Sequence, residues 1–124
     1  MLCTDVQVNY RSGRRMLPDN ENDLRAILHV PERIISITCC TEVASMEVEF
    51  SEEGAAYITL TNEITGTVYS LDSGSGGEEP VELLINVCPA EKMMCYDKEV
   101  ISDIVMHFCA TGEKNPKYTW EENS

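Results

Sequence analysis

The stretch IISITCCTEVASMEVEFSEEGAAYITL, residues 34–60, decides the fold of this chain. Within it, apolar residues alternate with glutamates through ASMEVEF (44–50), which is the period of a strand with one buried face and one wet face. The break at residues 51–54 is short and ends in glycine, as in a β-hairpin. The stretch therefore predicts three consecutive antiparallel strands, over residues 34–40, 44–50 and 55–61.

The β-rich pattern continues on the C-terminal side. A second short break, at residues 62–66, leads into the run TGTVYSL (65–71), and a further apolar run, VELLINV, covers residues 81–87. These two runs predict two more strands. Between them, the segment DSGSGGEEP (72–80) has low sequence complexity, which predicts a flexible, acidic loop.

The two ends of the chain add one strand each. Residues 3–10 alternate polar and apolar side chains and are followed by a Ser-Gly turn signal. Near the C-terminus, Tyr118 and Trp120 are the two largest apolar side chains of the run KYTWEE (117–122), and they are two residues apart. This alternation predicts a last strand before a charged tail.

A short helix is predicted after Pro18, where Asp19 or Asn20 can cap its N-terminus. Apolar residues spaced three and four apart follow this cap, and Pro31 ends the pattern. The spacing predicts an amphipathic helix of about three turns.

Residues 97–111 form the clearest helical pattern, with Asp97 as the N-cap and Gly112 placed to cap the C-terminus. Met106 is expected to lie off the apolar stripe. The stripe itself consists of Val100, Ile101, Ile104, Val105, Phe108 and Cys109.

The order of these elements segregates two helices from consecutive, hairpin-linked strands, and this order is typical of an α+β domain. We expect an antiparallel sheet of about five to seven strands, with the C-terminal helix packed on it. A chain of 124 residues is long enough for one core, so residues 1–124 are expected to form a single domain.

The charge of the chain limits its partners. Its 22 acidic and 9 basic residues give a net charge of −13, while 43% of its residues are hydrophobic, which is enough for a folded core. Phosphate backbones and anionic membrane surfaces repel such a chain, so we expect neither nucleic acid nor membrane as a partner. No segment is long and apolar enough to span a bilayer or serve as a signal peptide, which favours the cytoplasm. A macromolecular partner is expected to be basic.

All five arginines fall within residues 1–33. Arg11, Arg14 and Arg15 could bind an anion, but the acidic residues nearby favour a solvated surface turn.

No motif in the sequence predicts catalysis, a metal site or a cofactor. The six cysteines lack zinc-ligand spacing, and without an export signal they are expected to be reduced thiols. The two histidines, His29 and His107, offer no clear partner for a cysteine nucleophile, and phosphate-binding or nucleophile-elbow motifs are absent. We therefore expect no catalytic residues, no metal ligands, no cofactor and no enzymatic activity.

The stretch VISDIVMHFCATGEKNPKYTWEE (100–122) resembles the ending of immunity protein family one of bacterial polymorphic toxin systems. That ending is an amphipathic helix, a phrase like A-T-G-x-x-P, and a strand that ends in Trp with an acid. Asn115 stands as one extra residue before the proline, and the family's aromatic-rich segment is not evident in INVCPAEKMMCY (85–96). The matching positions are Phe108, Ala110, Thr111, Gly112, Pro116, Trp120 and Glu121.

The resemblance implies an antidote that binds a cognate toxin domain and blocks it, commonly a nucleic-acid deaminase and sometimes a nuclease. Acidic composition agrees with such a role, because nucleic-acid enzymes carry basic grooves that an acidic protein complements. The alternative is a small acidic adaptor or regulatory subunit that binds a basic protein. In either case the chain is expected to be a monomer or a homodimer.

Candidate partner-binding residues are exposed acids in predicted turns and near the C-terminus. Trp120 has two interpretations: it is a packing residue, or it is an interface anchor beside acids. The candidates are Glu52, Glu53, Asp72, Glu78, Glu79, Trp120 and Glu121.

Overall fold

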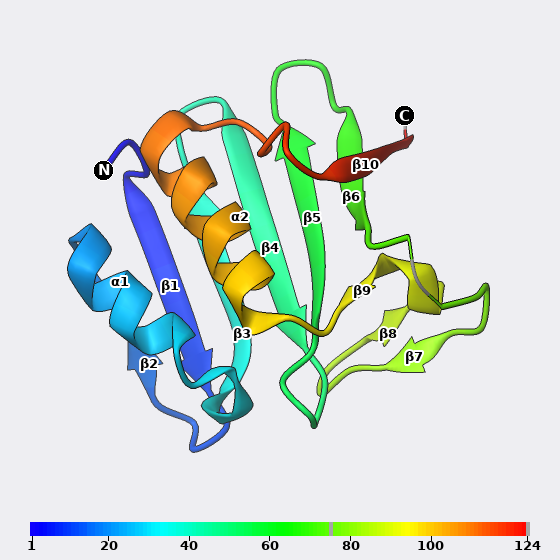
Figure 1. Cartoon of the computed structure of the whole chain (residues 1–124). Coiled ribbons are helices and arrows are strands. Elements are labelled where there is room, and N and C mark those ends of the chain that lie inside the picture. The colour runs from blue at the N-terminus through cyan, green and yellow to red at the C-terminus, as the bar shows by residue number, and fades with distance from the viewer. Residues whose placement is uncertain (75, 124) are drawn as a thin grey trace.

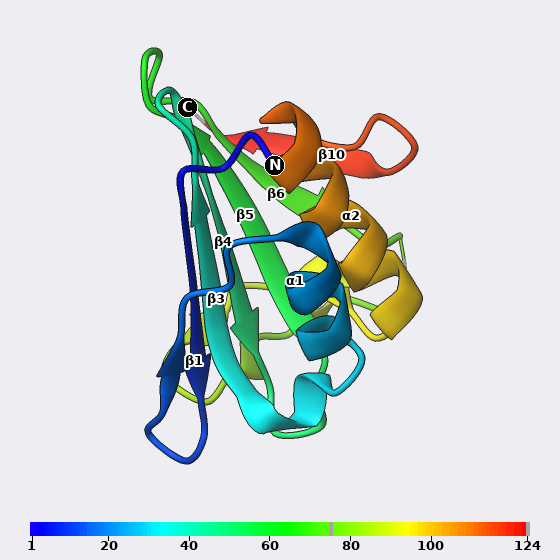
Figure 2. The ribbon, with the colours of Figure 1, turned by 90° about the vertical axis from the view of Figure 1, so that its left-hand side faces the viewer.

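The computed structural model, which describes residues 1–74 and 76–123, is an α+β fold with both helices on one face of a mostly antiparallel sheet (Figures 1 and 2). The main sheet has the strand order β10-β6-β5-β4-β3-β1-β2, and a short strand, β9, also pairs with β5. The strands are β1 (Asp5–Tyr10), β2 (Arg15–Met16), β3 (Ile34–Cys40), β4 (Ala44–Phe50), β5 (Ala56–Asn62), β6 (Val68–Asp72), β7 (Val81–Glu82), β8 (Val87–Cys88), β9 (Met94–Cys95) and β10 (Thr119–Asn123). The helices are α1 (Glu21–Leu28) and α2 (Lys98–Thr111), with 3-10 turns η1 (Pro31–Arg33) and η2 (Glu91–Met93).

The central strands β3, β4 and β5 confirm the prediction to within one residue at each end. Both predicted hairpins are present, and Gly54 and Gly66 adopt positive φ angles of 85° and 76° in their turns, a conformation that favours glycine. The predicted faces are also confirmed: Val48 is fully buried in the core, whereas Glu47 on the opposite face is exposed.

Helix α2 has both predicted caps and packs on the sheet. The Asp97 carboxylate accepts a hydrogen bond from the Glu99 N–H, and Gly112 ends the helix in the left-handed conformation. Met106 was predicted to lie off the apolar stripe, but it is buried, because it faces the groove beside Arg25 and His29 of α1. The position of α1 thus widens the buried stripe of α2.

Helix α1 is shorter than predicted. It has eight residues instead of about three turns, and Asn20 is its cap, accepting a hydrogen bond from the Asp23 N–H. The helix ends before Pro31, which instead begins η1.

Two strand predictions were wrong in extent. Residues 81–87 do not form one strand: β7 and β8 are two-residue strands of a separate hairpin, because the Leu83 N–H bonds to the Asn86 carbonyl and reverses the chain. The strand predicted from residue 65 begins only at Val68, because the preceding residues complete the β5–β6 turn.

Candidate partner-binding face

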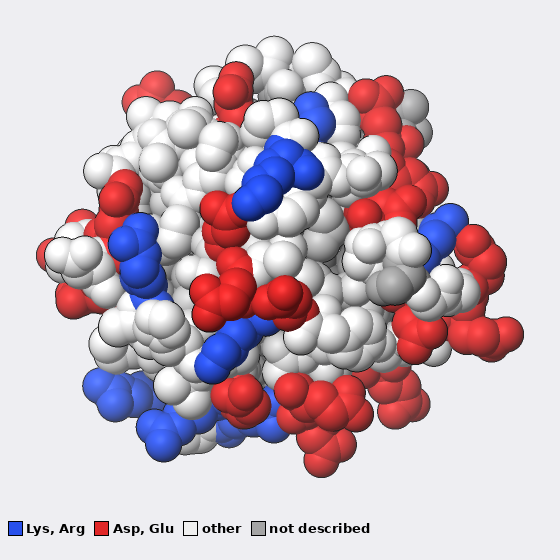
Figure 3. All heavy atoms as spheres, in the orientation of Figure 1, with Lys and Arg blue, Asp and Glu red and all other residues white. Residues whose placement is uncertain are grey.

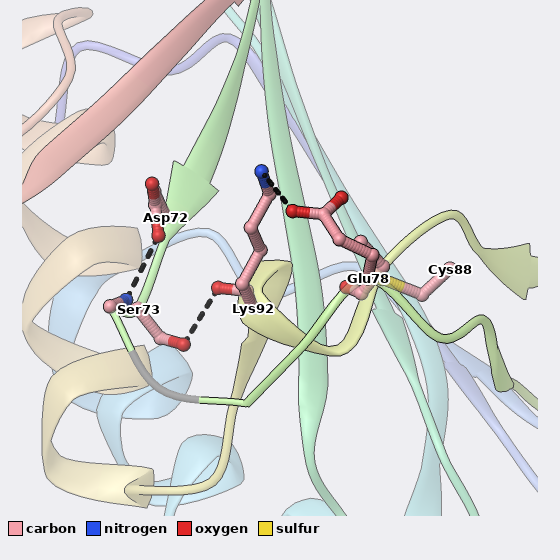
Figure 4. Close-up of polar contacts among 7 residues, drawn as sticks. Asp72, Ser73, Glu78, Cys88 and Lys92 are labelled. Atoms are coloured by element: carbon pink, nitrogen blue, oxygen red, sulfur yellow. Dashed lines mark hydrogen bonds and ion pairs between the residues drawn. The ribbon is translucent and has the colours of Figure 1, made fainter.

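Three of the predicted carboxylates lie around one lysine of η2. Lys92 Nζ forms an ion pair with Glu78 Oε1 at 2.9 Å (Figure 4). The pKa of Lys92 lies above its usual value, chiefly because of the hydrogen bond and charge of Glu78, with smaller contributions from Glu121 and Asp72. Asp72 and Glu121 approach each other because β10 pairs with β6. Residues from three separate segments therefore form one acidic group.

The segment between β6 and β7 was predicted to be a flexible, acidic loop, and in the structure Ser73, Gly77 and Glu79 form hydrogen bonds with η2. The Ser73 hydroxyl donates to the Lys92 carbonyl at 2.7 Å (Figure 4). The Lys92 N–H donates to the Gly77 carbonyl, and the Glu91 N–H donates to the Glu79 carbonyl. These bonds hold the backbone of residues 77–79 beside η2, and the Glu78 side chain reaches Lys92.

A second acidic group adjoins the first through Tyr96. Burial raises the pKa of the Tyr96 phenol, and the charges of Glu91 and Glu53 raise it further. The Tyr96 hydroxyl donates a long hydrogen bond, 3.5 Å, to Glu91 Oε2. Glu53, in the β4–β5 turn, acts on the same tyrosine as Glu91, although 38 positions separate the two residues in the sequence.

We call the combined surface the acidic face. Figure 3 shows red carboxylates along the right-hand edge of the molecule, over β6, β10 and the loop toward η2, while blue basic groups gather at the lower left. The acidic face consists of Glu53, Asp72, Glu78, Glu79, Glu91 and Glu121. The sequence missed Glu91 as a candidate, because only the fold brings this residue next to Glu79, through the hydrogen bond from the Glu91 N–H to the Glu79 carbonyl.

The two remaining candidates have structural contacts of their own. The Glu52 carbonyl accepts a hydrogen bond from the Arg11 guanidinium at 2.8 Å, and the same group donates to the Ser51 carbonyl at 2.9 Å. Arg11 therefore links the turn that follows β1 to the β4–β5 turn. Trp120 is half-buried against the core, and its indole N–H donates to the Asn115 carbonyl at 3.0 Å.

A cleft of about 420 Å³ lies beside the acidic face, lined by β9, the start of α2 and Tyr118. The Tyr118 hydroxyl donates to Asp103 Oδ2 at 2.6 Å. This hydrogen bond, together with burial and the charge of Asp103, raises the pKa of Tyr118 to about 12 from 10.0.

The Tyr118 phenol is therefore expected to ionise only near pH 12. Because its pKa is higher in the fold than in the unfolded chain, its contribution to stability is complete below pH 10 and is lost between pH 10 and about 12. Ultraviolet absorbance of tyrosinate should lose its highest-pH component in Tyr118→Phe and keep it in Tyr10→Phe. If the highest-pH component remains in both variants, the result would contradict the Tyr118–Asp103 contact.

All six cysteines, each of which lies in the described ranges, are free thiols. Cys40 is half-buried and the other five are buried, with Cys3, Cys39 and Cys109 close enough to exchange side-chain hydrogen bonds. Within residues 1–74 and 76–123, no group of three or more His, Cys, Asp or Glu side chains is placed to hold a metal ion.

We expect one thiol to react ahead of the others in the native protein. Burial and the charge of Asp5 raise the pKa of the Cys40 thiol, but burial shields the other five thiols from an aqueous reagent, so an alkylating agent at alkaline pH should modify Cys40 first, and denaturation should expose all six. Mass spectrometry of Cys40→Ser, compared with Cys88→Ser, tests the assignment. Stable disulfides in protein prepared anaerobically would contradict the prediction of reduced thiols.

Comparison with models of protein families and with curated proteins finds no match to this chain. Among solved structures, a hypothetical protein from Neisseria gonorrhoeae is similar, with a TM-score of 0.62 over 92% of each chain and 16% sequence identity. At this identity the similarity shows a shared fold. None of the helices in the described part of the chain is long and apolar enough to cross a membrane.

Proposed function

We propose that this protein is a cytoplasmic immunity protein that binds and neutralises a cognate toxin domain. The toxin is a basic, nucleic-acid-targeting deaminase or nuclease, and the immunity protein occludes its active site. The observation that carries the proposal is the acidic face, to which five separate segments contribute carboxylates. The resemblance of residues 100–122 to immunity protein family one supports the same function.

Occlusion needs shape and charge but no reactive group. A toxin that acts on nucleic acid holds its phosphate backbone with lysines and arginines, and a clustered acidic surface is complementary to such a groove. Long-range attraction between the two surfaces speeds their encounter, and the bound protein then excludes the substrate. On this proposal, the acidic face competes directly with the nucleic acid.

Co-expression tests the proposal. The C-terminal domain encoded directly upstream of this chain's gene is induced in a heterologous bacterium with and without this chain. We expect growth arrest without the chain and growth with it, while a toxin variant lacking its catalytic residue should arrest growth in neither case. Arrest that this chain does not relieve, or a neighbouring gene without a toxic domain, would contradict the proposal and favour the adaptor alternative.

A further inference from the structure

The β7–β8 hairpin carries an exposed apolar tip. Leu84, Ile85 and Val87 are 36%, 59% and 57% exposed, although they are large hydrophobic side chains within four residues of one another. Single exposed apolar residues are normal on a protein surface, but adjacent ones mark a contact surface. We call these three residues the hairpin tip. In Figure 1 the hairpin lies at the lower right, apart from the two helices.

The hairpin tip is held in place by the main sheet. The Leu84 N–H donates to the Phe50 carbonyl at 3.0 Å, and the Asn86 amide donates to the Glu49 carboxylate. Beneath the tip, Leu83 and the other inward-facing residues of the hairpin pack on a small buried cluster. A tip that is already ordered loses little conformational entropy on binding, so its apolar area can contribute to affinity.

The surroundings of the hairpin tip are acidic. Glu82 lies within the hairpin, Glu49 is bound to its turn through Asn86, and Glu53 follows Phe50 by three residues. Tyr96, which is 57% exposed, follows Cys95, which pairs with Ala56, three residues after Glu53. The hairpin tip is therefore continuous with the acidic face.

The negative charge around the hairpin tip determines which kind of protein can bind there. A second copy of the chain would bring another net charge of −13 against the same acids, which opposes pairing through this surface. A basic partner with an apolar recess satisfies both features, because its cations meet the carboxylates while the recess covers the tip.

We infer that the hairpin tip is the apolar anchor of the toxin interface and inserts into a hydrophobic recess rimmed by lysine and arginine. This inference rests on the proposed function and divides its interface into two parts. The acidic face controls the rate of association, whereas the hairpin tip controls the rate of dissociation.

The test compares two double variants that remove similar apolar groups. Ile85→Ser/Val87→Ser changes the hairpin tip, and the control Ile64→Ser/Val43→Ser changes exposed residues in the β5–β6 and β3–β4 turns, at the opposite end of the sheet (Figure 1). Binding of the upstream-encoded toxin domain, in its catalytically inactive form, is measured by surface-immobilised kinetics. We expect the tip variant to dissociate roughly 100-fold faster, with little change in association, and the control to match the unaltered protein.

Failure of this inference is distinguishable from failure of the proposed function. If the unaltered chain and the tip variant bind and protect equally, the anchor is overturned while the immunity function stands. If the unaltered chain does not protect, a photoreactive p-benzoylphenylalanine replaces Ile85 or, as control, Ile64 in the native host. A cross-link to a basic protein that forms from position 85 but not from position 64 then supports the hairpin tip as the anchor. The anchor is overturned if position 85 gives no cross-link, or if it cross-links to an acidic protein or to a second copy of this chain.

Discussion

Replacing Phe108 with alanine is expected to lower the free energy of unfolding by about 3–5 kcal/mol. Phe108 is fully buried on the inner face of α2, against the sheet, and truncation leaves a cavity where the ring now packs. Folded domains of this size are stable by only about 5–15 kcal/mol, so the loss is a large fraction of the total. Urea denaturation followed by circular dichroism measures it.

The neighbouring residue provides a matched control. His107 lies on the same turn of α2 but is only half-buried, so His107→Ala should change the free energy of unfolding by much less than Phe108→Ala. Equal midpoints for the two variants would mean that the buried face of the helix is assigned incorrectly. Because Phe108 is remote from solvent, any loss of toxin binding in Phe108→Ala should track the unfolded fraction.

Reversing two charges on the acidic face, Glu53→Lys/Glu79→Lys, is expected to slow association with the toxin domain by roughly 10- to 100-fold at low salt. Both side chains are exposed, and neither forms the ion pair to Lys92, so folding should be unchanged. Glu78 is a poorer choice for this experiment, because its removal would also release Lys92. For the variant, the association rate at low salt should differ less from the rate at high salt than it does for the unaltered protein, because the electrostatic attraction that speeds association is weakened.

A control double variant makes the same change in net charge outside the acidic face. Glu42 lies in the β3–β4 turn and Glu113 follows α2, and both are exposed at the other end of the molecule. Glu42→Lys/Glu113→Lys should retain most of the association rate if the position of the acids matters. Equal slowing in the two variants would indicate that overall charge, and not the acidic face, governs the encounter.

Asn115 illustrates how a departure from a sequence pattern can have a structural reason. In the sequence it stands as one extra residue before Pro116, relative to the expected phrase A-T-G-x-x-P. In the structure it is buried, its side-chain oxygen accepts a hydrogen bond from the Lys117 N–H, and its carbonyl accepts one from Trp120. The insertion therefore shapes the turn that leads into β10.

The sequence by itself determined the elements whose signals are local. Alternation through residues 44–50 specified which face of β4 is buried, and Asp97 and Gly112 marked both ends of α2, because capping and side-chain period depend on residues only a few positions apart. The run VELLINV was misjudged because seven mostly apolar residues fit either one buried strand or a tight hairpin, and the Leu83–Asn86 hydrogen bond decides between them.

Only the tertiary structure decided which side chains share a surface. Asp72 lies near Glu121 because β10 pairs with β6 at the edge of the sheet, and Glu53 lies near Tyr96 because β9 pairs with β5. Strand order and the path of long loops depend on how the whole core packs, so no local period encodes them. For the same reason the sequence did not predict the exposed hairpin tip: VELLINV is mostly apolar, and packing against the small cluster beneath it determines which of its residues are covered.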